Sequence, residues 1–204
     1  LSRLSISGTT GTLLACKPNG HNLGDAFSYD LIISEKIKNI KFLCEEKPFL
    51  KIPQNSISKA LILIDKYGED ILLRHQSDWI SGWILNNWKY GEDSNNITLG
   101  WNIVTQSWPT IFNKTQLKRN LPLIVRTGVN LGKIYEPIAK KNNINSDLLV
   151  VSGTTNSNAS FLGLQLQKQD ALTVIGETTI FKKYLKKSVL SNSFAISKIN
   201  GEWI

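Results

Sequence analysis

The chain has 204 residues, of which 41% are hydrophobic, and its formal net charge is +8. A chain of this length and composition can bury the core of one or two domains, which excludes general disorder. No apolar run approaches the roughly 20 residues that span a bilayer, and the first residues lack the blocks of a signal peptide. We therefore expect a cytoplasmic protein with no membrane partner.

The positive charge raises the hypothesis of a nucleic-acid-binding domain, because basic patches attract phosphates. The lysines are scattered, however, and the densest group, FKKYLKK at residues 181–187, lies in no nucleic-acid motif. Such charge runs usually keep a surface soluble. We expect no nucleic-acid partner and a solvated Lys182, although an anionic sugar phosphate or nucleotide would also suit a positive surface.

Cys16 and Cys44 lie in unrelated apolar stretches and form no metal or redox motif, so we expect a reducing compartment and no metal site. Both are expected to be small buried side chains. The chain contains no methionine, even at position 1, and neither end has the loose polar residues usual at domain ends. These features predict a fragment, with an unusual start codon written as leucine as the alternative for the first end.

The hydrophobic pattern predicts an alternation of strands and helices that is typical of an α/β fold. The stripe of Trp79, Ile80, Trp83 and Ile84 predicts a buried helix face. The predicted elements are two short strands within 3–16, a turn at 17–22, helices at 25–40, 56–66 and 72–88, a loop at 89–109, a helix end at 138–143, a strand at 148–151, a helix at 156–167 and strands at 171–175 and 179–184.

Three turns rich in Gly, Ser and Thr lie at strand ends, at residues 7–12, 152–155 and 176–179. Turns of this kind let backbone N–H groups and hydroxyls approach a polar or phosphorylated ligand. Each turn alone is better explained as a plain hairpin turn. Three of them in one α/β chain favour a single convergent polar site.

Further polar residues suit a binding site. Asp78 can accept a hydrogen bond from a sugar hydroxyl while the indole of Trp79 packs on the sugar ring. The alternative is that Trp79 belongs to the core and Asp78 is a solvated neighbour. His75 is the plausible histidine base, although a lone histidine on a helix more often has a structural role, and Asp93 suits a turn cap.

Four stretches, in their order and rough spacing, resemble the FGGY carbohydrate kinases. They are SGTTGTLLACKPNG at 7–20, HQSDWISGWILNNWKYGEDSNNITLGWNIVTQSWP at 75–109, LLVVSGTTNSNASFLGLQL at 148–166 and DALTVIGETTIFKKY at 170–184. The resemblance is closest to the cyanobacterial and plant branch described as D-ribulose or xylulose kinase-like.

The resemblance implies an α/β fold, the incomplete N-terminal domain of an actin-like ATPase (ribonuclease H-like). Residues 1–204 would be part of that domain, without its first phosphate-turn hairpin and without the C-terminal domain. The implied reaction is ATP-dependent phosphorylation of a ketopentose such as D-ribulose or D-xylulose, with Mg²⁺. Since the missing parts position the phosphates, this chain is expected to be inactive alone. A companion chain that completes the fold is a further candidate partner, and a non-catalytic, degenerate sugar-binding remnant is the alternative.

The resemblance also implies roles for individual residues. Asn156 stands where the family has its catalytic aspartate, and an amide has no useful basicity near neutral pH, although it can cap a helix as well as aspartate does. Glu177 departs from the family's Ser or Thr and would repel phosphates. The implied contacts are Thr9, Thr10, Asp78 and Trp79 for the sugar and Gly176, Thr178 and Thr179 for nucleotide phosphates.

These residues are expected to meet in space. In open α/β sheets, ligands bind beyond the carboxyl ends of the strands. We therefore expect Thr9–Thr10, Asp78–Trp79 and Asn156 to face one cleft.

Overall fold

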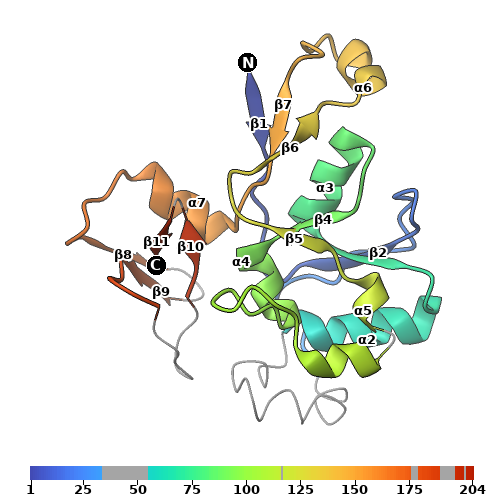
Figure 1. The fold of residues 1–204 in the computed structure, drawn as a ribbon, viewed down its shortest axis with the longest axis horizontal. Coiled ribbons are helices and arrows are strands. Elements are labelled where there is room, and N and C mark those ends of the chain that lie inside the picture. Colours follow the sequence, from blue (N-terminus) through green and yellow to red (C-terminus); the bar gives the residue numbers. More distant parts are fainter. Residues whose placement is uncertain (34–54, 116, 176–178, 189–195, 200) are drawn as a thin grey trace.

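The computed structural model describes residues 1–33, 55–115, 117–175, 179–188, 196–199 and 201–204. These residues form an α/β protein with a three-stranded sheet in the order β1-β7-β6 and several two-stranded sheets (Figure 1). Within this described part, no helix is both long and apolar enough to cross a membrane.

The elements follow one another with short strands between helices. The first are β1 (Arg3–Ser5), β2 (Leu13–Cys16), α2 (Ser56–Tyr67), β3 (Leu72–His75), α3 (Gln76–Leu85), β4 (Tyr90–Glu92), α4 (Asp93–Asn96) and the 3-10 helix η3 (Ile97–Leu99). The remainder are the 3-10 helix η4 (Thr110–Lys114), α5 (Leu117–Asn120), β5 (Leu123–Val125), β6 (Asn130–Lys133), α6 (Glu136–Lys141), β7 (Leu149–Val151), α7 (Asn156–Gly163), β8 (Ala171–Ile175), β9 (Thr179–Lys183), β10 (Lys198–Ile199) and β11 (Glu202–Trp203).

The three-stranded sheet sets the position of two turns. β1 runs parallel to β7, with Leu4 opposite Val150, and β6 pairs antiparallel on the other side of β7. Val150 and Leu148 are fully buried in a core that includes Ile84 of α3. Because parallel strands end at the same edge of a sheet, the segments after β1 and β7 start side by side.

The pair β2–β3 separates two cores. Its strands are antiparallel, and successive side chains point to opposite faces. On one face Leu13 and Leu73 pack against α2, while on the other Leu14 and Cys16 pack against Trp88. Cys16 is buried as expected, and burial raises the pKa of its thiol to about 11; Cys44 lies outside the described residues.

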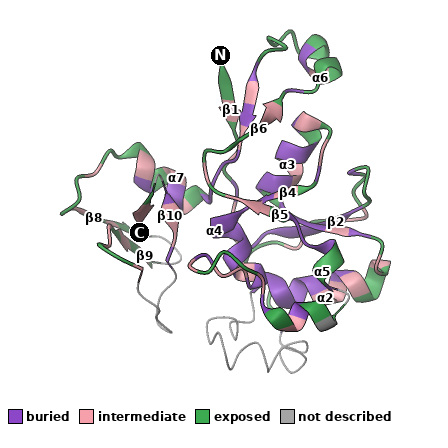
Figure 2. Cartoon of the chain, in the orientation of Figure 1, coloured by how far each residue is buried: buried purple, intermediate pink, exposed green. Residues whose placement is uncertain are grey.

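The C-terminal elements form a separate small core around α7. Phe161 is buried with Ile199 and Ile204, and its ring packs edge-on against Tyr184 with the centroids 5.0 Å apart. The hairpin β8–β9 is far more open: the side chains of Ile175 and Phe181 are 83% and 63% exposed (Figure 2).

Several predicted elements are confirmed. The helix predicted at 56–66 is α2, and Gly68 is its C-cap. The strands predicted at 148–151, 171–175 and 179–184 correspond to β7, β8 and β9. The helix end predicted at 138–143 falls on α6, and the helix predicted from residue 156 is α7, which ends at Gly163 rather than near residue 167.

Other predictions are wrong for identifiable reasons. Residues 72–75 form a strand instead of the first turn of a helix, because they pair with β2. Residues 25–33 are not helical, since the backbone of Phe27 bonds to that of Leu13 in both directions; residues 34–40 lie outside the described part. The loop predicted at 89–109 contains β4, α4 and η3. Trp83, predicted to be buried, is 49% exposed.

We predict that Gly153→Ala destabilises the chain strongly. A Cβ at this position would lie 1.7 Å from the carbonyl oxygen of Ile6, and backbone on both sides would have to move. The expected loss in the free energy of unfolding is about 3 kcal/mol or more, measured by urea denaturation.

The matched control is Gly163→Ala. A Cβ there has nothing within 4 Å, and alanine in the helix should improve stability by up to about 1 kcal/mol. Equal effects of the two substitutions would contradict the close packing at Gly153.

Candidate functional site

The turns after β1 and β7 are joined through their main chains. The N–H of Asn156 donates to the carbonyl of Gly8 at 2.9 Å, and the N–H of Gly8 donates to the carbonyl of Thr154 at 3.3 Å. A Cβ on Gly8 would lie 2.8 Å from the Cβ of Ser77. The absence of a side chain at this position therefore allows three segments to meet.

Helix α7 begins at this junction. Thr155 is its N-cap, and its hydroxyl accepts a hydrogen bond from the N–H of Asn158 at 3.4 Å. Asn156 is the first helical residue, is exposed, and accepts the N–H of Ser157 at its own Oδ1. The cap expected near Asn156 is therefore Thr155, one residue earlier, because a threonine with extended backbone occupies the cap position.

An open cleft of about 520 Å³ adjoins the two turns. Its polar wall is formed by Thr10 from the first turn, Thr155, Ser157 and Asn158 from the start of α7, Ser94 from α4, and Lys182 from β9. Apolar residues, among them Ile97, Phe181 and Leu185, complete the lining. The cleft thus combines hydroxyl groups with apolar surface.

Lys182 and Lys183, both from β9, supply positive charge to the cleft, and Lys182 is the half-buried one. The ammonium of Lys182 donates to Oδ1 of Asn158, and burial lowers its pKa to about 8. Among the described residues, no Asp or Glu lines the cleft, and no cluster of His, Cys, Asp and Glu could hold a metal ion.

Glu92 links the two turns from behind the cleft. One carboxylate oxygen accepts hydrogen bonds from the hydroxyls of Thr127 and Thr154, at 2.9 and 3.3 Å. The other accepts the N–H of Asn95 at 2.9 Å, and Asn95 in turn accepts the N–H of Gly11 at 3.0 Å. Glu92 therefore contacts the second turn directly and the first turn through Asn95.

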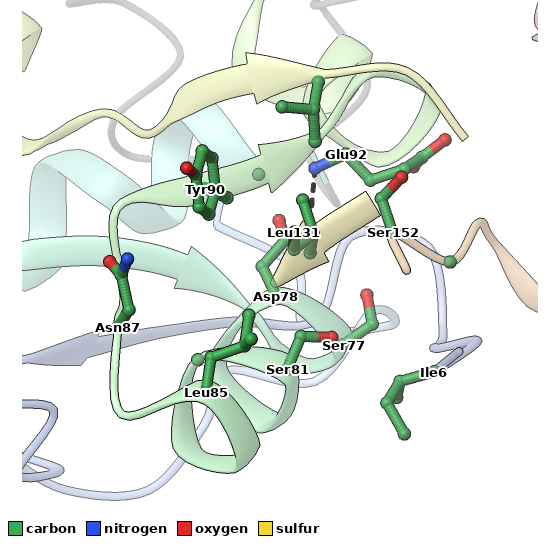
Figure 3. A pocket seen from close by; sticks show the side chains of 14 residues that line it. Ile6, Ser77, Asp78, Ser81, Leu85, Asn87, Tyr90, Glu92, Leu131 and Ser152 are labelled. Carbon is green, nitrogen blue, oxygen red and sulfur yellow. Dashed lines mark hydrogen bonds between the residues drawn. The ribbon is translucent and has the colours of Figure 1, made fainter. Parts of the chain in front are cut away.

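Asp78 is buried next to Glu92. Its carboxylate accepts the N–H of Glu92 at 3.0 Å (Figure 3). It also accepts a hydrogen bond from the side-chain amide of Asn96 at 3.2 Å. Burial, followed by the nearby charge of Glu92, raises the pKa of Asp78 to about 7. Burial and Glu92 also raise the pKa of Asp93. Asp78 borders a small internal hollow with Ser77, Ser152 and Gly153 instead of the cleft.

His75 and Lys59 hold the first turn from its other side. His75 is fully buried, with Nε2 3.0 Å from the hydroxyl of Ser56, and burial together with the charge of Lys59 lowers its pKa to about 3. The ammonium of Lys59 donates to the carbonyls of Gly11 and Ser28, at 3.0 and 2.7 Å. A neutral, enclosed His75 fits the structural role and does not reach the cleft.

The structure brings together only some of the residues predicted to meet. Thr10 lines the cleft, half-exposed Thr9 is next to it, and Asn156 lies at the start of α7 beside it. Trp79 is elsewhere: its indole N–H donates to the carbonyl of Gly20 at 3.0 Å, and its ring packs with Leu14 and Trp88. Thr179 is exposed at the start of β9, whereas Gly176, Glu177 and Thr178 lie outside the described residues.

Sequence reasoning missed Lys182 and Glu92. Lys182 was expected to be solvated, yet it is two residues from half-buried Ile180 on the same side of β9. Because side chains alternate between the two faces of a strand, the sequence could have predicted that Lys182 shares a face with Ile180. Apart from its bond to Asn95, Glu92 carried no signal, because Thr127 and Thr154 are 35 and 62 residues away in sequence.

No protein-family model matches the sequence. The structure is similar to xylulose kinase from Rhodospirillum rubrum (TM-score 0.85, 13% identity, 99% of this chain and 45% of that one). It is also similar to ligand-bound xylulose kinase from Lactobacillus acidophilus (TM-score 0.83, 14% identity, 100% of this chain and 45% of that one). A third similar structure is Plasmodium falciparum glycerol kinase with ADP (TM-score 0.74, 14% identity, 90% of this chain and 40% of that one). This is the fold of the N-terminal half of FGGY sugar kinases. The chain spans less than half the length of these three proteins.

We predict a pH-dependent cost for Asp78→Asn. An unfolded aspartate titrates near pH 4, whereas the folded pKa is about 7. The folded state therefore takes up a proton, and the contribution of Asp78 to stability falls as the pH rises between these values. Asparagine does not titrate, so the cost of the substitution should be largest near pH 4.5 and shrink by up to about 1.4 kcal/mol per pH unit towards pH 7.

Urea denaturation of both proteins at intervals between pH 4.5 and 7.5 measures this difference. The depressed pKa of His75 makes the stability of either protein fall at acid pH, so the cost of the substitution is taken as the difference between the two proteins at each pH. His75 Nδ1 lies 3.9 Å from Oδ2 of Asp78, and the slope is therefore read above about pH 5.5, where the two proteins differ mainly in the Asp78 carboxyl. A cost that stays constant over the range would contradict a raised pKa at Asp78.

Proposed function

We propose that the chain is part of an ATP-dependent carbohydrate kinase acting on a ketopentose such as D-ribulose or D-xylulose, in the D-ribulose or xylulose kinase-like branch, and that it is inactive alone. The observation that carries this proposal is the joining of the Gly8 and Thr154 turns beside a cleft lined by hydroxyls and Lys182. Two of the similar structures are xylulose kinases. Residues 1–204 then form part of the N-terminal domain.

In this proposal the sugar occupies the polar side of the cleft. Thr10 and Ser94 offer hydroxyls that can both donate and accept, as sugar hydroxyls require. Thr9 is a second contact from the same turn. Asp78 acts through Glu92, which it holds by the N–H, and Trp79 supports the packing behind the turn.

The nucleotide requires residues that this chain supplies only in part. Gly176, Thr178 and Thr179, which follow β8 in the sequence, are proposed to contact its phosphates. Lys182 and Lys183 add positive charge to the described cleft. Mg²⁺ prefers carboxylate and water oxygens, and no carboxylate lines the described cleft. The residues present do not fit the metal, so its ligands would come from the remainder of a kinase.

Asn156 decides against catalysis by this chain. Its amide stands at the aspartate position implied by the resemblance, at an exposed helix start beside the cleft, and cannot take a proton from a sugar hydroxyl. The same observation favours the second candidate, a non-catalytic remnant that keeps sugar binding.

Sugar binding by the cleft is the first test. Titration calorimetry with D-xylulose and D-ribulose should show binding, and Thr10→Val should weaken it by about 3- to 10-fold through the loss of one hydrogen bond. Thr173→Val, an exposed threonine of β8 outside the cleft, is the matched control and should change nothing. The proposal fails if neither sugar binds or if the two variants behave alike.

Phosphoryl transfer is the second test. With ATP, Mg²⁺ and a panel of ketopentoses and polyols, the chain should release no sugar-dependent ADP. Asn156→Asp should not restore turnover, because a general base contributes only about 10²–10⁴-fold and the phosphate-positioning parts contribute more. Turnover by the parent chain that Asn156→Ala abolishes would overturn the inactive assignment. Turnover by Asn156→Asp alone would show that the other parts are not needed.

A further inference from the structure

A second hollow of about 540 Å³ lies away from the cleft and shares no lining residue with it. Its walls come from β3, from the segment after α3, and from α5 and the start of β5. Three of its lining residues are cationic, Arg74, Lys89 and Arg119, and none is acidic. We refer to this hollow as the basic groove.

Arg74 is the buried member of the basic groove, with 2% of its surface exposed. Its guanidinium donates to the carbonyl oxygens of Trp88, Leu73 and Asn120, the last two at 2.7 and 3.0 Å. These partners are neutral. Among the described residues, no carboxylate forms an ion pair with the guanidinium. Burial lowers the pKa of Arg74 to about 10, and the nearby groups of Cys16 and Asp78 oppose this shift in part.

The carbonyls orient the buried cation, and Asp78, which makes no ion pair with it, compensates its charge only in part. Carbonyl dipoles fix the plane of the guanidinium, whereas a buried charge is normally compensated by an opposite one. The fixed fork of donors also matches the oxygens of a phosphate or carboxylate. An anion in the basic groove would supply the missing charge without rearranging Arg74.

The other two cations of the basic groove, Lys89 and Arg119, are exposed at the surface, where a ligand can reach them. Lys89 lies over the ring of Tyr90, with Nζ 4.7 Å from the centroid. Arg119 pairs with Glu69 at 2.7 Å, and both side chains are partly exposed. An exposed pair of this kind is weak and competes poorly with a dianion.

The remaining walls are apolar or carry amides. Leu72, Leu121, Leu123 and Trp88 line the groove beside Asn86 and Asn87. The side chain of Leu123 is 61% exposed. This surface suits a ring or an alkyl group next to the anionic part of a ligand.

We propose that the basic groove binds a small phosphate monoester that carries an apolar or aromatic group. The phosphate contacts Arg74, Lys89 and Arg119, and the apolar group packs on Leu123 and its neighbours. This proposal is independent of the kinase function, since it uses none of the residues of the cleft.

The test uses inorganic phosphate and phenyl phosphate as probes, titrated calorimetrically into the purified chain at low salt. Phenyl phosphate should bind more tightly, and both affinities should fall as salt is added. Lys89→Gln and Arg119→Gln should each weaken phosphate binding by about 5-fold, the size expected for one surface charge near an anion. Glu69→Gln releases Arg119 and should tighten binding.

Two controls separate this site from general attraction to a basic protein. Lys141→Gln removes one exposed charge outside the groove and should leave both affinities unchanged. Leu123→Ser should weaken phenyl phosphate but not inorganic phosphate. Circular dichroism checks that each variant is folded. No binding, equal weakening by Lys89→Gln and Lys141→Gln, or equal affinities for the two probes would overturn the proposal.

Discussion

The close crossing of the turns after β1 and β7 is the contact on which the arrangement of the site depends. The α-carbon of Gly153 faces the carbonyl of Ile6 so closely that a Cβ would lie 1.7 Å from its oxygen. This approach lets Gly8 and Asn156 share main-chain hydrogen bonds, and it places Thr10 and Thr155 on one cleft. Parallel pairing of β1 with β7 brings the turns to one edge, and the glycines let them touch.

The crossing is supported by polar groups that are costly to bury. Glu92, Asp78 and Asp93 are each at most 7% exposed, and the pKa values of Asp78 and Asp93 are raised by burial and by the nearby charge of Glu92. Hydrogen bonds from backbone N–H groups and hydroxyls compensate Glu92 and Asp78. Buried carboxyl groups with shifted pKa values are typical of functional sites, where the placement of a side chain matters more than its contribution to stability.

The fold of this chain does not by itself establish its chemistry. The described structure follows sugar kinases closely although identities are only 13–14%, because a fold tolerates many side chains that keep the hydrophobic pattern. Chemistry depends on single groups, and an amide at position 156 keeps the helix start while lacking basicity. Binding and catalysis are therefore distinct questions for this protein, and the basic groove is distinct from both.

The sequence by itself determined the elements with long or well-bounded local patterns. The apolar spacing before Gly68 specifies α2, and the apolar run before Gly153 specifies β7. The α/β class and the meeting of the first turn with the start of α7 also followed from local patterns and strand order. Each of these depends on contacts between residues near in sequence or on a general rule of parallel sheets.

Only the tertiary structure decided the features set by distant partners. The segment Leu72–His75 suits a helix or a strand, and pairing with β2 selects the strand. The inward position of Asp78 depends on the N–H of Glu92, 14 residues away. The bond from Glu92 to the second turn reaches Thr154, 62 residues away, and Arg74 is held by carbonyls 14 and 46 residues away. A local pattern cannot specify where a polar side chain points, because its direction follows from the partner that compensates its burial.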